Sequence, residues 1–144
     1  FIKPIKALQV GGPLGGVIPI KEVEKLNLDF QEFTKAGFML GHGSIVSIPE
    51  DFNMIKYIHH LFKFSAEESC GKCFPGRLGS YRGKEMFDQA INKTNKIPIK
   101  LLNELLVTMQ KGSLCALCGA IPLPIQNILK YFTDEFKTDI NQEA

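Results

Sequence analysis

The stretch ESCGKCFP at residues 68–75 and the stretch SLCALC at residues 113–118 hold all four cysteines of this chain. Each stretch contains one C-x2-C pair, and 41 residues separate the two pairs. A spacer of two residues lets both sulfur atoms of a pair turn toward one point, as a soft metal centre requires. The candidate cofactor-binding and metal-ligating residues are Cys70, Cys73, Cys115 and Cys118.

Several chemistries use paired cysteines. We expect no disulfides, because the helix-rich pattern and the expected absence of a secretory leader suit a reduced cytosolic or organellar protein. A dithiol redox motif at Cys70 and Cys73 lacks the strand that precedes such a motif. Tetrahedral zinc and an iron–sulfur cluster each take four thiolates, so the spacing alone leaves both open. Lys72, Arg77 and Arg82 lie in or after the first pair, and cations at these positions would stabilise thiolates.

Helical periodicity extends outward from both pairs. Apolar residues recur at helical spacing over four segments, 54–62, 82–92, 101–109 and 125–136. Asp51 is the predicted N-cap of the first helix. The cysteine pairs fall in the first and third links between these helices, and in an up-and-down bundle those two links lie at one end. The sequence therefore predicts a four-helix bundle over residues 51–144, with a metal site in its end loops.

Residues 1–50 have a different pattern. Short apolar runs predict strands over 5–10, 17–20 and 43–48, with one helix over 21–35 between the last two. The glycine-rich run at 11–16 is not followed by Lys-Ser or Lys-Thr, so it is predicted to be a turn between strands and not a phosphate-binding loop. We therefore expect an α+β fold class, with a small β-grasp-like domain before the bundle.

The composition limits the function. The 144 residues suit one compact domain or two small ones. The formal net charge is only +2, which is too balanced for the cationic face of a nucleic-acid binder. No apolar run approaches the ~18 residues that cross a bilayer, so we expect no direct membrane insertion. Because the first residue is Phe1, we expect a processed form or a piece of a longer polypeptide.

Both cysteine stretches resemble the cluster-bearing part of the NADH-binding flavoprotein subunit of respiratory complex I. The same module occurs in diaphorase subunits of NAD-linked hydrogenases and formate dehydrogenases. The resemblance is carried by residues 9–16, 68–75, 112–117 and 122–136. It implies a β-grasp-like domain followed by a four-helix bundle that holds one [4Fe-4S] cluster, and a role as an electron-transfer module.

The chain departs from this family at two positions. The family's first loop carries a third cysteine where this chain has Gly76, and the family usually has glycine where this chain has Cys118. One ligand is lost and one is gained, so we expect Cys118 to complete the set of four. A structural zinc scaffold that docks partners without redox activity is the alternative, and a metal-free chain is a third hypothesis. If a cluster is bound, we expect the backbone amides of Ser69, Gly71 and Ser113 to donate hydrogen bonds to its sulfur atoms.

The resemblance also implies partners. The family's flavin and NADH sites lie in a domain N-terminal to the matched part, so we expect this chain alone to bind neither. The expected partners are a flavin- and NADH-binding domain or subunit and a ferredoxin-like iron–sulfur subunit. The chain would then be one part of an NADH dehydrogenase or diaphorase complex, at its periphery, in the cytoplasm or an organelle matrix.

Overall fold

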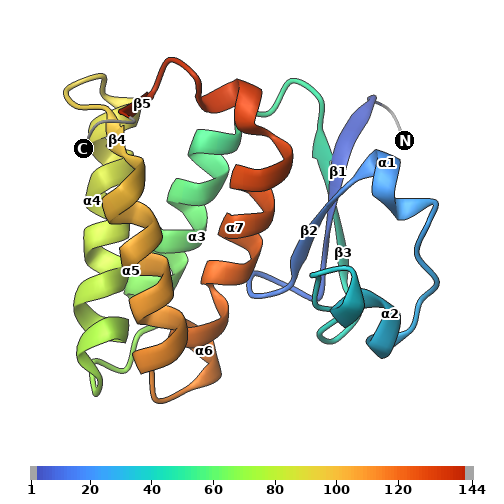
Figure 1. The fold of residues 1–144 in the computed structure, drawn as a ribbon, viewed down its shortest axis with the longest axis horizontal. Helices are drawn as coiled ribbons and strands as arrows, with labels where there is room; N and C mark the ends of the chain where they lie inside the picture. Colours follow the sequence, from blue (N-terminus) through green and yellow to red (C-terminus); the bar gives the residue numbers. More distant parts are fainter. Residues whose placement is uncertain (1–2, 142–144) are drawn as a thin grey trace. The chain divides into compact units, whose positions relative to one another are not determined.

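A computed structural model describes residues 3–141 as a mixture of helices and strands (Figure 1). The described residues divide into two compact units. The first unit runs up to Phe52 and also includes Leu123–Tyr131, and the second comprises Asn53–Pro122 and the residues from Phe132 onward. The division into domains at 1–50 and 51–144 stays a prediction.

A three-stranded antiparallel sheet forms the base of the first unit. Its strands are β1 (Ile5–Val10), β2 (Gly16–Pro19) and β3 (Ile45–Pro49), in the order β2–β1–β3. Leu8 of the central strand lies opposite Ile18 of β2 and opposite Ser47 of β3. The strands lie close to where the sequence predicts them, and the glycine-rich run is the turn between β1 and β2, as expected.

The single helix predicted over 21–35 is wrong. The structure has two short helices there, α1 (Ile20–Val23) and α2 (Phe30–Lys35). The Asp29 carboxylate accepts hydrogen bonds of 2.9 and 3.0 Å from two backbone N–H groups in the first turn of α2. An aspartate in this position caps a new helix, so it begins α2 as a separate element.

The core of the first unit lies between the sheet and α2. Val10, Ile18, Phe33 and Phe38 are buried together, and Tyr131 packs against them. The rings of Phe38 and Tyr131 stack with their centroids 5.9 Å apart. Because Tyr131 ends the helix α7 (Pro122–Tyr131), a segment from late in the sequence completes this core.

A buried amide also joins α7 to the rest of the first unit. The Asn127 side chain accepts a hydrogen bond from the Val17 N–H at 3.3 Å and donates one to the Gly37 carbonyl at 3.0 Å. Asn127 is buried, so these bonds offset the cost of removing its amide from water. They also give hydrogen-bond partners to two backbone groups of the first unit.

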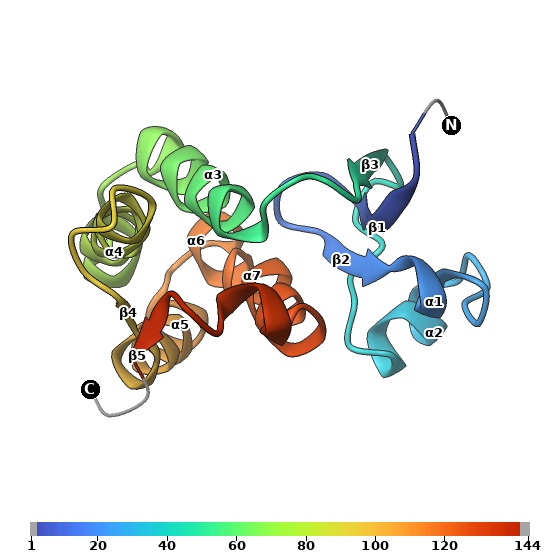
Figure 2. The same cartoon turned by 90° about the horizontal axis from the view of Figure 1, so that it is seen from above.

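The second unit is mainly helical. Its longer helices are α3 (Met54–Glu68), α4 (Ser80–Ile91) and α5 (Ile99–Gly112), and Figure 2 shows them from above, nearly end on. Its shorter elements are the π-helical turn η1 (Pro75–Gly79), α6 (Ala116–Ala120), the 3-10 helix η2 (Thr133–Phe136), and the parallel pair β4 (Ile97–Pro98) and β5 (Ile140–Asn141). No helix in the described range 3–141 has the length and apolar character that a membrane crossing needs.

Two predicted helix boundaries need correction. Asn53, and not Asp51, caps α3, because its side-chain oxygen accepts from the N–H groups of Ile55 and Lys56 at 2.8 and 3.1 Å. The fourth predicted helix, over 125–136, stops at Tyr131, and a separate 3-10 turn follows it. The remaining predicted helices match α4 and α5 to within a few residues.

Helices α3 and α4 approach closely because one position between them has no side chain. A Cβ atom added at Gly83 of α4 would lie 2.2 Å from Cε1 of Phe62 on α3. The Phe62 ring is fully buried, and it packs against Phe87 at a centroid distance of 5.8 Å. The ring therefore has little room to move away from a new methyl group.

We expect Gly83→Ala to lower the free energy of unfolding by about 1–3 kcal/mol, because overpacking in this core outweighs the better helix propensity of alanine. Urea unfolding followed by circular dichroism measures the loss. Gly119→Ala is the matched control, because its nearest new contact is an ordinary 3.7 Å to the Ser113 Cβ. Equal stability of the two variants would contradict the close approach of α3 and α4.

Candidate metal centre

The first cysteine pair lies in the turn that leads from α3 into η1. Gly71 has φ +74°, a left-handed conformation that favours glycine, so the chain can reverse direction between Cys70 and Cys73. Pro75 then opens η1, which contacts α3, α4, α5 and α6. π-helical turns are rare and are found frequently at functional sites.

The second pair is predicted to lie in a link between two helices. In the structure this link contains the short helix α6, and the pair lies at its start. Cys115 is the residue before its first turn, in an extended conformation, and its carbonyl accepts from the Gly119 N–H at 3.2 Å. Cys118 lies inside the helix and is buried. The connection from α3 to η1 and the connection from α5 to α6 lie at the same end of the second unit, at the foot of Figure 1.

Two of the four sulfur atoms meet beside Gly76. A Cβ atom added there would lie 2.9 Å from the Cys73 Sγ and 3.1 Å from the Cys118 Sγ. Both sulfurs therefore border the space that a side chain at this position would fill. A cysteine from each pair, 45 residues apart in the sequence, is thus brought to one point.

The other two cysteines stand further out. Cys70 and Cys115 are exposed, Cys73 is half-buried, and Cys118 is only 2 % exposed. Within residues 3–141, no three His, Cys, Asp or Glu side chains are close enough together to hold a metal ion as they stand. The structure therefore places the Cys73 and Cys118 sulfur atoms on either side of Gly76 and leaves Cys70 and Cys115 exposed.

Backbone N–H groups from both segments surround the Cys73 sulfur. A hydrogen bond from the Leu114 backbone, followed by one from Gly76, lowers the pKa of the Cys73 thiol below its usual value. The Ser113 side chain lowers this pKa further, although its buried hydroxyl makes no well-formed hydrogen bond among the described residues. The thiolate form, which binds metals, is therefore favoured at this position.

The donation of hydrogen bonds from the Ser69, Gly71 and Ser113 amides to cluster sulfur atoms stays a prediction, and two of these three amides have protein partners among the described residues. The Gly71 N–H donates to the Ser69 hydroxyl at 3.3 Å, and the Ser113 N–H donates to the Met109 carbonyl at 3.2 Å. The groups that reach the Cys73 sulfur belong to Leu114 and Gly76 instead. The turn around Gly71 and the end of α5 use the predicted donors for their own backbone structure.

Two of the three predicted cationic residues have other partners. Arg82 forms an ion pair with Glu85 at 3.2 Å, and the Arg77 guanidinium lies over the Phe74 ring at 5.4 Å. Backbone dipoles, and not these side chains, therefore lower the pKa of Cys73.

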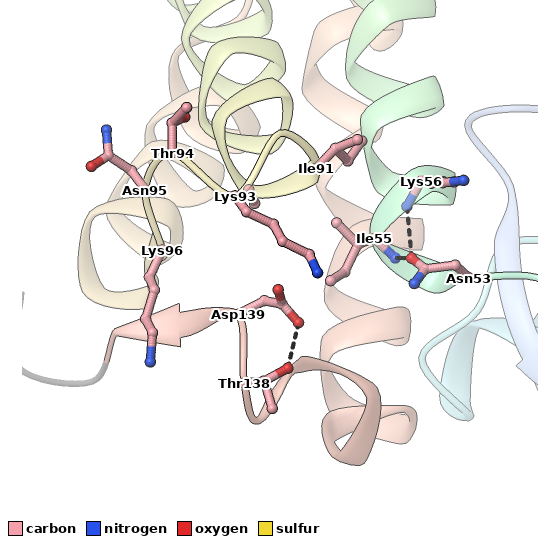
Figure 3. A pocket seen from close by; sticks show the side chains of 11 residues that line it. Asn53, Ile55, Lys56, Ile91, Lys93, Thr94, Asn95, Lys96, Thr138 and Asp139 are labelled. Carbon is pink, nitrogen blue, oxygen red and sulfur yellow. Dashed lines mark hydrogen bonds between the residues drawn. The ribbon is translucent and has the colours of Figure 1, made fainter.

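A cavity of about 700 Å³ lies near the start of α3 and the end of α4, and no cysteine lines it. Figure 3 shows the Lys93 and Asp139 side chains pointing toward each other there, while Asn95 and Lys96 point away. The Thr138 hydroxyl donates to the Asp139 carboxylate at 2.7 Å. The cysteine pairs follow the other end of α3, so this cavity is separate from the candidate metal centre.

The residues at the cysteine end fit a thiolate-ligated centre. The two segments carry four free thiols, and thiolates are soft ligands that suit zinc and iron–sulfur clusters. N–H donors already face one of the sulfurs, and the buried Ser113 hydroxyl beside it lacks a partner among residues 3–141. Hydrogen bonds of this kind orient ligands and tune a bound centre.

Comparison with known proteins points to the same chemistry. Residues 56–139 match the family model described as the NADH-ubiquinone oxidoreductase-F iron–sulfur binding region. The NADP-reducing hydrogenase subunit HndC of Solidesulfovibrio fructosivorans is 29% identical over 142 residues, which are 98% of this chain and 29% of that protein. A subunit of the NADH-quinone oxidoreductase of Buchnera aphidicola is 32% identical over 139 residues, which are 95% of this chain and 31% of that protein. The chain thus spans about a third of the length of these relatives.

Solved structures show the same fold. A chain of an NAD⁺-reducing [NiFe]-hydrogenase in the H2-reduced state has a TM-score of 0.84 at 21% identity. The match covers 97% of the present chain and 24% of the hydrogenase chain. It confirms the predicted α+β fold class.

We expect Cys118 to be alkylated at least tenfold more slowly than Cys115 in the reduced, metal-free chain, because a buried thiol reacts only when the fold opens locally. Peptide mass spectrometry after timed treatment with iodoacetamide measures both rates in one sample. Cys115 is the internal control, three residues away and exposed. The two thiols should react at equal rates in urea, where the chain is unfolded. Equal rates in the folded chain as well would show that Cys118 is not buried.

Proposed function

Since this chain belongs to the family of NADH-ubiquinone oxidoreductase-F iron–sulfur binding regions, we propose that it relays electrons through one [4Fe-4S] cluster. The proposed ligands are Cys70, Cys73, Cys115 and Cys118. The family membership favours the 4Fe-4S cluster over zinc, two centres that the cysteine spacing alone left open. An iron–sulfur region of an NADH-linked oxidoreductase acts in electron transfer. We propose that this chain carries out that transfer through a single cluster.

The observation that carries the ligand assignment is the shared space at Gly76. The chain lacks the cysteine that the family pattern has there, and the Cys118 sulfur borders the volume that such a side chain would fill. In this proposal, a thiol from α6 takes the place of a thiol from η1. Four thiolates remain available, the number that a cubane cluster takes.

The chain's own residues give these ligands different surroundings. Cys118 is buried in the second unit, and the Cys73 sulfur receives N–H groups from Gly76 and Leu114. Cys70 and Cys115 are exposed, so their side chains are free to turn toward a centre that forms between the two segments. A bound cluster would supply one-electron transfer, with no bond made to a substrate.

We further propose that the electron donor is a flavin on another domain or chain and that the acceptor is a ferredoxin-like iron–sulfur subunit. Large apolar side chains flank the cysteines on the surface: Phe74 is 70% exposed and Leu114 is 80% exposed. Exposed apolar groups at such a site support contact with a partner protein. The chain would then be a peripheral part of a larger complex, in the cytoplasm or an organelle matrix.

We expect anaerobic reconstitution with iron and sulfide to give a brown protein with about four irons per chain. Cys118→Gly should lose most of this iron, because one of the four ligands is gone. Adding Gly76→Cys to that variant should restore it, because the space left by the Cys118 side chain accepts the new thiol. Iron, sulfide and zinc contents per chain are measured for the wild type, for Cys118→Gly and for the double variant.

Retention of four irons by Cys118→Gly would overturn the assignment of Cys118 as a ligand. A colourless wild-type protein with one tightly bound zinc would favour the second candidate function, a structural scaffold without redox activity. That alternative rests on the same four cysteines, since four thiolates also suit tetrahedral zinc.

A further inference from the structure

A buried hydroxyl contacts the unusual ligand. Ser65 lies on α3 and is fully buried, and its Oγ is 3.6 Å from the Cys118 Sγ, 53 residues away in the sequence. We infer that Ser65 is a positioning residue for the Cys118 thiolate and that its hydroxyl raises the reduction potential of the cluster. The inference rests on the proposed function, because it assumes that Cys118 is a ligand.

The surroundings of Ser65 explain why its hydroxyl needs this partner. The same helix buries Leu61, Phe62 and Ala66, so this face of α3 is otherwise apolar. A hydroxyl buried in such surroundings costs free energy unless it makes a hydrogen bond. Among residues 3–141, the Cys118 sulfur is the partner that the structure gives it.

Metal binding fixes the direction of this hydrogen bond. In the metal-free protein either atom of this pair can donate. A metal ligand is a thiolate and has no hydrogen to give. The Ser65 O–H must then donate to the Cys118 Sγ, and the contact becomes a charge-assisted hydrogen bond.

Such a bond favours the reduced state. A bound cluster would gain one negative charge with each electron that it took from a chemical reductant or a reduced flavin, and no proton or ligand would leave. A donor that points at a ligating sulfur stabilises the more negative state, and hydrogen bonds to sulfur are among the factors that set cluster potentials. Loss of the Ser65 hydroxyl should therefore make the potential more negative.

The second unit offers a matched control. Ser80 is also a fully buried serine, and its hydroxyl donates to the Gly76 carbonyl at 2.6 Å. Ser80→Ala therefore removes a buried hydroxyl that supports the Gly76 backbone, while the donor to the Cys118 sulfur stays in place. If Ser65 acted only through stability, Ser65→Ala and Ser80→Ala would have the same effect on the cluster.

The experiment compares wild type, Ser65→Ala, Ser65→Thr and Ser80→Ala after anaerobic reconstitution, by redox titration with EPR detection. At a fixed applied potential, we expect Ser65→Ala to lower the ratio of reduced to oxidised cluster about tenfold. This change corresponds to a midpoint potential about 59 mV more negative for a one-electron couple. Its EPR spectrum should change as well. Ser65→Thr should keep the wild-type potential, and Ser80→Ala should keep it while losing stability.

An unchanged potential in Ser65→Ala, or an equal shift in Ser80→Ala, would overturn the inference. The contact is also tested without a cluster: the infrared S–H stretching band of Cys118 in the metal-free chain should shift in Ser65→Ala and not in Ser80→Ala. A shifted band together with full iron content in Cys118→Gly would show that the contact exists while the ligand assignment fails. An unshifted band would show that the contact itself is wrong.

Discussion

The close approach at Gly76 governs the rest of the candidate centre. Glycine there leaves space that the sulfur atoms of Cys73 and Cys118 share, and any larger side chain would displace one of them. The turn η1 carries this glycine into contact with α3, α4, α5 and α6. A segment of five residues thus determines which cysteines can act together, while the longer helices hold it in place.

The environment on either side of this glycine is asymmetric. Cys73 faces backbone N–H groups and lies near the surface, whereas Cys118 is buried and contacts one hydroxyl. In the proposed cluster, these two ligands would stabilise negative charge by different means. A side-chain substitution does not remove the backbone N–H groups at Cys73, but it does remove the Ser65 hydroxyl at Cys118. A single substitution at Ser65 would therefore change the reduction potential of the proposed cluster.

The pattern of residues was enough to predict the longer helices and the three strands of the first unit, because apolar periodicity reports directly on burial. The four cysteines as ligands of one centre stay a prediction. The pattern failed where two local interactions compete. Asp51 and Asn53 are both good N-caps, and only the packed structure selects Asn53. Asp29 divides a periodic segment that otherwise looks continuous. The contact of Ser65 with Cys118 joins positions 53 residues apart, and no local signal marks it.

The hydrogen bonds of Asn127 have a consequence for how the chain is made and divided. The partner of the Val17 N–H is synthesised 110 residues later, after both cysteine segments have left the peptidyl-transferase centre. The sheet unit therefore cannot be completed during translation until the cysteine-bearing part already exists. For the same reason, no single cut separates the two units intact. The chain passes from one unit to the other after Phe52, after Pro122 and after Tyr131, so an exchange of the whole cysteine-bearing unit between proteins needs three junctions.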